Sequence, residues 1–213
     1  MSSIWPLEDC FSSLPLGKQR VRDWSSASEL KNSWQLLDLH AEAVAANKSW
    51  DGNSPAQLDD GARISVGEGT KILPGVYVEG DVVIGKNCKI GPNCYLRGPI
   101  SVGDDCHVGQ AVELKNTILG DGVSVGHLSY VGDSILGPGV NFGAGTITSN
   151  LRHDGTNHAT MVDGELVDTG RRKLGAIVGP NVHTGIHTSL YPGRKLGPDT
   201  TTLPGEVVSR DKH

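Results

Sequence analysis

The strongest constraint on the fold of this chain is an aliphatic residue that returns at every sixth position. The series is Val66, Ile72, Val78, Ile84, Ile90, Leu96, Val102, Val108 and Leu114. An α-helix repeats its apolar residues about every 3.6 positions, and a half-buried strand repeats them every second position. A period of six, often followed by glycine, is typical of short flat strands joined by tight turns, three of which make a coil of about 18 residues. We therefore predict an all-β solenoid, a left-handed parallel β-helix of hexapeptide repeats, with the hand taken from the repeat type.

The period slips twice and then breaks off. It resumes one residue early at Leu119 and again at Leu136, and it returns from Val178 to Val208 after a gap. The gap predicts a loop excursion at 150–173, with a small hairpin turning at Asp163-Gly164. Allowing about 120 repeat residues, we expect roughly six to seven coils.

Residues 1–57 lack the period, so we divide the chain into an N-terminal extension and a β-helix spanning 58–213. Within the extension, Ala27–Asn47 is predicted to form one amphipathic helix, with Ser25 or Ser26 as its N-cap. The apolar stripe of this helix consists of Leu30, Trp34, Leu37, Ala41, Val44 and Ala45. We expect the helix to cap the open first coil or to pack on a neighbour.

Composition restricts the compartment and the partners. Only 37% of residues are hydrophobic and 5% aromatic, which suits a thin core, and the net charge of −5 argues against nucleic-acid binding. No apolar run reaches the roughly 18 residues of a membrane span, and the N-terminus does not resemble a secretory signal. We therefore expect a soluble cytoplasmic protein without a membrane partner. Cys88, Cys94 and Cys106 fall on the apolar repeat and fit no zinc spacing, so we expect core cysteines and no metal site.

Polar residues that depart from the repeat are the candidates for chemistry. They are densest in Gly126–Asp133 (GHLSYVGD) and Asn141–Asn150 (NFGAGTITSN). Upstream, Lys115 lies eighteen residues after Arg97 and twelve before the histidine of the first motif. With this spacing, the region resembles the acetyltransferase domain of the bifunctional glucosamine-1-phosphate acetyltransferase/N-acetylglucosamine-1-phosphate uridyltransferase family. The resemblance is closest over roughly residues 60–150.

The resemblance implies an N-acetyltransferase that uses acetyl-CoA as co-substrate and an amino-sugar 1-phosphate, such as glucosamine 1-phosphate, as acceptor. His127 would be the general base, since an imidazole exchanges protons near neutral pH. Arg97 and Lys115 would hold the 1-phosphate. The sugar or the acyl group would be positioned by Tyr130, Asn141 and Asn150. The coenzyme would meet the turn Gly143, Ala144 and Gly145, whose N–H groups are candidate oxyanion donors. By the same resemblance, we expect a homotrimer with its active site between subunits.

Other features depart from the family. Thr156 stands where the family carries a phosphate-binding lysine, and Ile186 and Pro204 replace small residues at its coenzyme A site. Residues 1–57 hold no glycine-rich nucleotide loop, so we expect no uridyltransferase domain and no pyrophosphorylase activity.

Two alternatives stay open. The altered phosphate and coenzyme positions favour a non-catalytic hexapeptide scaffold or regulatory subunit, which measured acetyl-CoA binding would separate from the enzyme. A zinc hydratase of the γ-carbonic anhydrase kind would need three converging histidines, with His107, His127, His183 and His187 as candidates.

Overall fold

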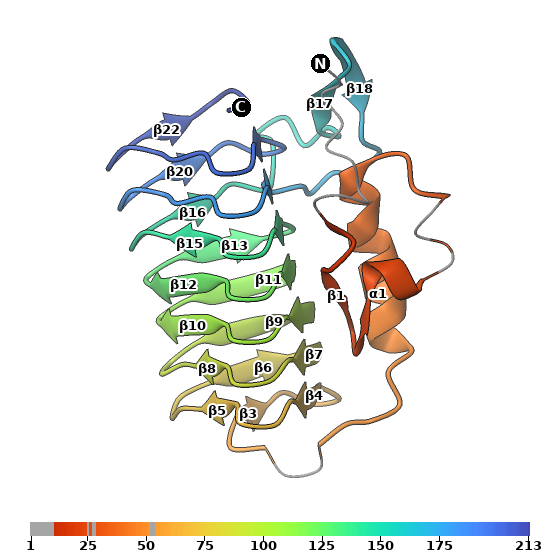
Figure 1. The fold of residues 1–213 in the computed structure, drawn as a ribbon, viewed down its shortest axis with the longest axis vertical. Coiled ribbons are helices and arrows are strands. Elements are labelled where there is room, and N and C mark those ends of the chain that lie inside the picture. The colour runs from red at the N-terminus through yellow and green to blue at the C-terminus, as the bar shows by residue number, and fades with distance from the viewer. Residues whose placement is uncertain (1–10, 25, 27–28, 52–53) are drawn as a thin grey trace.

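The structure, a computed structural model, describes residues 11–24, 26, 29–51 and 54–213 and shows a parallel β-helix with a short helix along its side (Figure 1). Each coil contributes to three walls. The first wall stacks β3 (Gln57–Leu58), β6 (Tyr77–Glu79), the start of β9 (Tyr95–Val102), the start of β11 (Glu113–Leu119), β13 (Tyr130–Gly132), β16 (Ile147–Thr148), β20 (Ser189–Leu190) and β22 (Val207–Val208). The second wall stacks β4 (Arg63–Val66), β7 (Asp81–Ile84), the ends of β9 and β11, β14 (Ile135–Leu136), β19 (Ile177–Val178) and β21 (Lys195–Leu196). The third stacks β5 (Lys71–Ile72), β8 (Lys89–Ile90), β10 (His107–Gln110), β12 (Ser124–His127) and β15 (Asn141–Phe142).

The predicted fold class is confirmed, and the register explains each irregularity of the period. Tyr77 pairs with Tyr95 and Tyr95 with Glu113, so these coils hold three full hexapeptides. Glu113 pairs with Tyr130 and Tyr130 with Ile147, so the next two coils are one residue shorter. The shortening falls at the corner between the first and second walls, where the register of β11 on β9 shifts between Lys115 and Thr117. The solenoid is longer than the six to seven coils expected: eight segments stack on the first wall of the described chain.

The core is the thin, aliphatic interior that the period predicts. The repeat side chains from Ile84 onward, including Ile90, Leu96 and Leu114, are almost fully buried and pack in one cluster. Cys88, Cys94 and Cys106 are buried free cysteines in that interior, whereas Cys10 lies outside the described residues. Several inward positions of the last coils are threonines, which are buried as well.

The helix of the N-terminal extension is shorter than predicted and begins later. The structure has a 3₁₀ turn, η4 (Ser33–Gln35), that leads directly into α1 (Leu36–Ala45). The helical region starts after Asn32, where Gln35 Oε1 accepts the Asn32 N–H at 2.8 Å. Ser26 lies well before it, and Ser25 is outside the described residues. The α1 helix runs beside the second wall, against β7, β9 and β11, and does not close the first coil (Figure 1).

A second apolar cluster joins the extension to the solenoid. The extension also contains the hairpin β1 (Pro15–Leu16)–β2 (Gln19–Arg20) and the 3₁₀ turn η2 (Val21–Asp23). Leu36, Leu37 and Leu39 of the helical region pack with Ile118, Ile135 and Ile177, which point outward from the second wall. The outward face of that wall is thus apolar because the extension covers it.

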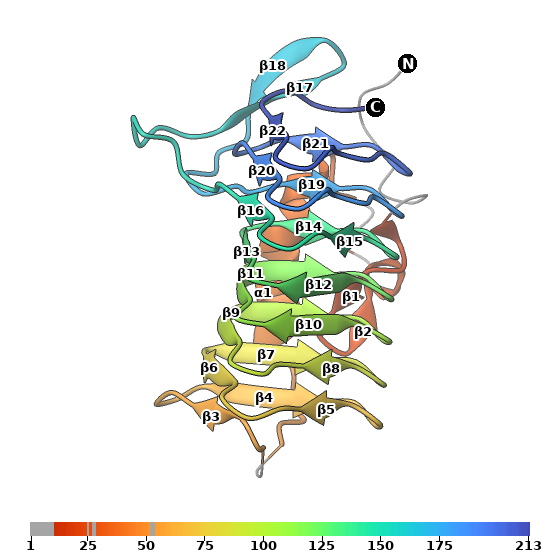
Figure 2. The same cartoon turned by 90° about the vertical axis from the view of Figure 1, so that its left-hand side faces the viewer.

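The loop excursion interrupts the stack between β16 and β20. Ile147 pairs with Ser189, so this coil exceeds an ordinary one by the whole of segment 150–173. The excursion holds the antiparallel hairpin β17 (Ala159–Val162)–β18 (Glu165–Asp168), and both Asp163 and Gly164 have positive φ at its turn, as predicted. Figure 2 shows the excursion projecting near the C-terminal end of the solenoid. No helix of the described chain is long and apolar enough to cross a membrane.

Candidate active site

Four of the predicted site residues gather on the first wall, at its shortened corner. Lys115 Nζ lies 3.0 Å from Asp133 Oδ2, and Asn150 Nδ2 donates to the same oxygen at 2.5 Å. Asn150 Nδ2 also lies 2.9 Å from the Tyr130 hydroxyl oxygen, to which it donates. Arg97 stands one coil below Lys115 in the same column. Residues that are far apart in the sequence are thus brought to one polar corner.

Asp133 is the centre of this network, and sequence reasoning did not assign it a role. Its carboxylate is 3% exposed and also accepts from Asn116 Nδ2 at 2.9 Å. Asn116 and Asp133 both have positive φ, which lets the chain turn sharply at the shortened corner. The only sequence signal for Asp133 is its place at the end of the GHLSYVGD motif, because a buried carboxylate looks like any other turn aspartate in the sequence.

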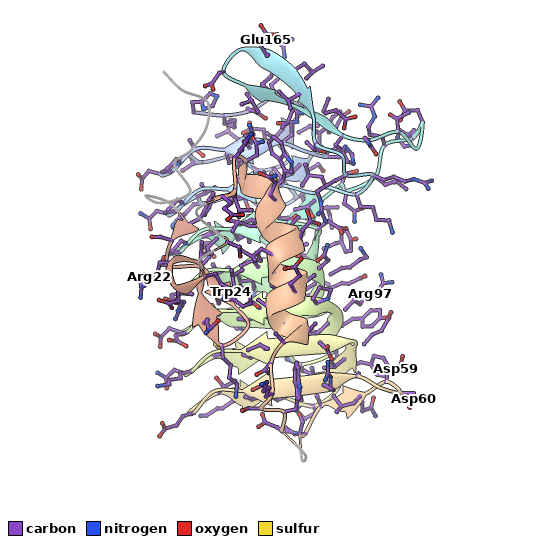
Figure 3. The ribbon with its side chains drawn as sticks, turned by 90° about the vertical axis from the view of Figure 1, so that its right-hand side faces the viewer. Arg22, Trp24, Asp59, Asp60, Arg97 and Glu165 are labelled. Atoms are coloured by element: carbon purple, nitrogen blue, oxygen red, sulfur yellow. The ribbon has the colours of Figure 1, made fainter. Side chains whose placement is uncertain are left out.

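Arg97 projects from the flank of the solenoid beside α1 (Figure 3). Its Nη1 donates to Glu113 Oε1 at 3.0 Å, and its Nε lies 3.5 Å from Glu79 Oε2. These carboxylates, which were also not predicted, raise the pKa of the Arg97 guanidinium, chiefly through the Glu113 hydrogen bond. The predicted phosphate clamp therefore consists of two cations that face three carboxylates, those of Glu79, Glu113 and Asp133.

The Tyr130 phenol is held in its protonated form. Burial raises its pKa, and the negative charges of Asp133 and Glu113 raise it further. Because Asn150 donates to the phenolic oxygen, the phenolic proton is available to a substrate oxygen or nitrogen.

His127 lies at the opposite edge of the first wall, at the corner where β12 meets the turn to β13. It is exposed and stands in a column between Gln110 below and Ala144 above, as the backbone hydrogen bonds of successive corners show. Ile186 and Pro204, the departures from the family, lie at the same corner in the coils above. Within one chain, the structure does not bring His127 together with Arg97 and Lys115, because the width of the wall separates them.

Asn141 and the glycine turn lie on this side as well. Asn141 is an exposed residue of the third wall, above Ser124, and does not join the Asp133 network. The Gly143 N–H donates to Thr184, and the Gly145 N–H donates to the His127 carbonyl oxygen at 3.1 Å. Among the described residues, the Ala144 N–H alone in this turn has no intramolecular acceptor, so it is the amide available to an oxyanion.

A cavity of about 670 Å³ opens on the first wall directly above this network. It lies between β16, β20 and Ser209 on one side and residues 151–154 and 158–159 of the excursion on the other, and we call it the overhang cavity. No residue inside it was predicted to bind substrate, because its walls come from segments that the excursion separates in sequence. The zinc alternative gains no support, since no group of three metal-ligating side chains converges in the described part of the chain.

Comparison with known proteins finds similarity to transferases over part of the chain. Residues 63–98 and 81–116 match the family described as bacterial transferase hexapeptide (six repeats). A bifunctional sugar-1-phosphate nucleotidylyltransferase/acetyltransferase of Sulfurisphaera tokodaii is 42% identical over 101 residues, which are 47% of this chain and 25% of that protein. The bifunctional protein GlmU of Methanococcus maripaludis is 41% identical over 99 residues, 46% of this chain and 24% of that protein. The match thus spans about half of this chain and about a quarter of those relatives.

Solved structures are more distant. A Bacillus cereus protein described as an acetyltransferase superposes with a TM-score of 0.42 at 17% identity, over 75% of this chain and 74% of that one. A mutant GDP-perosamine N-acetyltransferase of Caulobacter crescentus, in complex with CoA and GDP-perosamine, has a TM-score of 0.20 at 19% identity, over 74% of this chain and 47% of that one.

Proposed function

We propose that the chain is an acetyltransferase that moves the acetyl group of acetyl-CoA to the amine of an amino-sugar 1-phosphate. The observation that carries the proposal is the convergence of the motif residues Lys115, Tyr130 and Asn150 around Asp133. A structural role for each alone would not require them to meet at one exposed wall. Similarity to sugar-1-phosphate acetyltransferases over about half of the chain supports the same substrate class.

In the proposed reaction, the neutral amine of the sugar attacks the thioester carbonyl. His127 takes the proton that the amine loses as the new amide bond forms, and the thiolate of coenzyme A leaves. The Ala144 N–H is the donor available to the oxyanion, and the Tyr130 hydroxyl and Asn150 hold the acceptor. Acetyl-CoA supplies the activated acyl group, and the residues of this chain align it with the amine and move the proton.

A second copy of the chain is part of the proposal. His127 and the Lys115–Asp133 network lie at opposite edges of one wall, so they face one substrate only when the corner of a second protomer approaches the wall. A trimer with its symmetry axis along the solenoid would supply that arrangement at three equivalent interfaces.

Two observations favour the scaffold alternative. Both proposed phosphate-binding cations are already paired with carboxylates, and two of the three turn amides are already bonded. A regulatory subunit of this kind would bind no acetyl-CoA. Calorimetric titration of the purified chain with acetyl-CoA separates the two functions.

The test of the enzyme is acetyl transfer from acetyl-CoA to glucosamine 1-phosphate, followed by thiol release. His127→Ala should reduce transfer at least about a hundredfold, which is the typical contribution of a general base. His107→Ala, a nearby histidine of the third wall outside the proposed machinery, is the matched control and should stay active. The proposal fails if the wild-type chain consumes no acetyl-CoA with any hexosamine phosphate.

A further inference from the structure

The overhang cavity extends the candidate site upward along the same wall. Ile147, which lines the cavity, pairs directly with Tyr130 of the coil below, and Ser189 pairs with Ile147 above. Adjacent strands are about 4.8 Å apart, so the cavity begins one strand spacing from the Tyr130 position. Its volume of about 670 Å³ lies within the range of about 300–1,000 Å³ of small-molecule sites.

The excursion is tied to the polar network at the point where it forms the cavity. His158, a buried residue of the cavity, has its Nε2 3.1 Å from the carbonyl oxygen of Asn150. Burial lowers the pKa of His158 and so favours its neutral ring, whose Nε2–H donates this bond. Asn150 therefore connects to the cavity through its backbone and to Tyr130 through its side chain.

The charge of the cavity differs from that of the predicted phosphate clamp. Two guanidinium groups, Arg152 and Arg194, line it, and they face two carboxylates, those of Asp154 and Asp211. Arg152 binds Asp154 through Nε and Nη2, and Arg194 Nη1 lies 3.6 Å from Asp211, so each guanidinium keeps one terminal nitrogen without a partner among the described residues. At Arg97 and Lys115, by contrast, three carboxylates outnumber the two cations. An anion is therefore better accommodated in the cavity than in the clamp.

The neutral lining of the cavity suits a sugar. Ser149, Ser189 and Ser209 present hydroxyl groups that have no hydrogen-bond partner among the described residues. Tyr191 is 52% exposed beside them and offers an apolar ring next to Ile147 and Pro192. Hydroxyl groups beside an exposed aromatic ring match the alternating polar and apolar surface of a pyranose.

We propose that the overhang cavity binds the phosphorylated end of the acceptor, with Arg152 and Arg194 as its anion ligands and Tyr191 as its platform. The proposal rests on the proposed acetyltransferase function and names the part of the site that selects its substrate. The phosphate-bearing ligand is a sugar 1-phosphate or a nucleoside diphosphate sugar, since both carry a phosphate group on the anomeric carbon of a pyranose.

The experiment measures binding by isothermal titration calorimetry with three probes: glucosamine, glucosamine 1-phosphate and UDP-glucosamine. The test variants are Arg152→Gln and Arg194→Gln. Arg63→Gln is the matched control, because Arg63 and Arg152 are both 45% exposed and both bind an aspartate through two nitrogens. The fourth variant, Arg97→Gln, tests the predicted clamp.

We expect the phosphorylated probes to bind more tightly than glucosamine, and Arg152→Gln and Arg194→Gln to weaken them about tenfold or more, as the loss of a charged hydrogen bond does. The tighter of the two phosphorylated probes identifies the ligand. Arg63→Gln should bind like the wild type. The proposal is overturned if neither phosphorylated probe binds, or if only Arg97→Gln weakens them.

Steady-state kinetics provide the second readout. The two cavity variants should raise KM for the acceptor and leave KM for acetyl-CoA unchanged; the reverse pattern would place the donor in the cavity and overturn the proposal. If the wild type transfers no acetyl group, the proposed function fails, and the calorimetric result still decides whether the cavity binds sugar phosphates.

Discussion

Lowering the pH from 7 to 5 should cost the folded chain about 2 kcal/mol through one buried histidine of α1. His40 is fully buried between the helix and the second wall. Its Nε2 lies 3.0 Å from Ser101 Oγ, which also accepts the Gly17 N–H at 2.9 Å. Its Nδ1 has no partner in the described chain, so a protonated ring would bury a charge with an unsatisfied donor.

The magnitude follows from the pKa. Burial lowers the pKa of His40 from 6.5 to about 3. As the pH falls below 6.5, the unfolded chain takes up a proton that the folded chain refuses until about pH 3, so the free energy of unfolding falls through this window. Each pH unit is worth about 1.4 kcal/mol, which gives about 2 kcal/mol at pH 5 and about 5 kcal/mol below pH 3.

The assay is urea unfolding at pH 7 and pH 5 followed by tryptophan fluorescence. All four tryptophans, Trp5, Trp24, Trp34 and Trp50, precede the first solenoid strand, so the signal reports the extension that His40 anchors. His40→Leu fills a similar volume and cannot titrate, and every other histidine contributes equally to both proteins. The difference in pH dependence between wild type and His40→Leu therefore isolates this residue.

We expect the wild type to lose about 2 kcal/mol more than His40→Leu between the two pH values. An equal loss in both proteins would contradict this role of His40, because it would mean that the ring is hydrated or already paired when charged.

Three further results are expected. Gly109→Ala should destabilise the solenoid by about 1–3 kcal/mol in urea unfolding, because the added Cβ would lie 1.8 Å from the Gly126 carbonyl oxygen. Gly126→Ala is the control and should leave the stability unchanged, because its Cβ would meet no atom within 4 Å. Equal effects of the two substitutions would contradict this steric argument. Asp133→Asn should lower the free energy of unfolding by about 2 kcal/mol and reduce acetyl transfer, since it leaves Lys115 without its anion. If neither the stability nor the transfer rate changed, Asp133 would have no role in the site. Lys195→Met should speed proteolysis within residues 159–168 several-fold, because Lys195 Nζ donates a hydrogen bond to the Met161 carbonyl oxygen at 2.6 Å and so anchors the hairpin. An unchanged cleavage rate would contradict that role.

The sequence marks some residues of the candidate site but not the partners that these residues contact. The motif around His127 and Tyr130 marks polar residues because they interrupt an apolar pattern. The partners of these residues carry no such mark. Glu79 and Glu113 occupy ordinary outward positions, and only the register between successive coils places both beside Arg97.

The amino-acid sequence alone predicts the inward side chains, the coil length, the excursion at 150–173 and its Asp163-Gly164 turn. These follow from local rules, because a six-residue step and a turn dipeptide constrain only near neighbours. Other features depend on contacts between distant segments: α1 lies along the second wall, Asp133 pairs with Lys115, and the excursion encloses a cavity beside the Tyr130 strand. Outward side chains have no periodic constraint, so their partners depend on which coils and which appended segments are stacked against them.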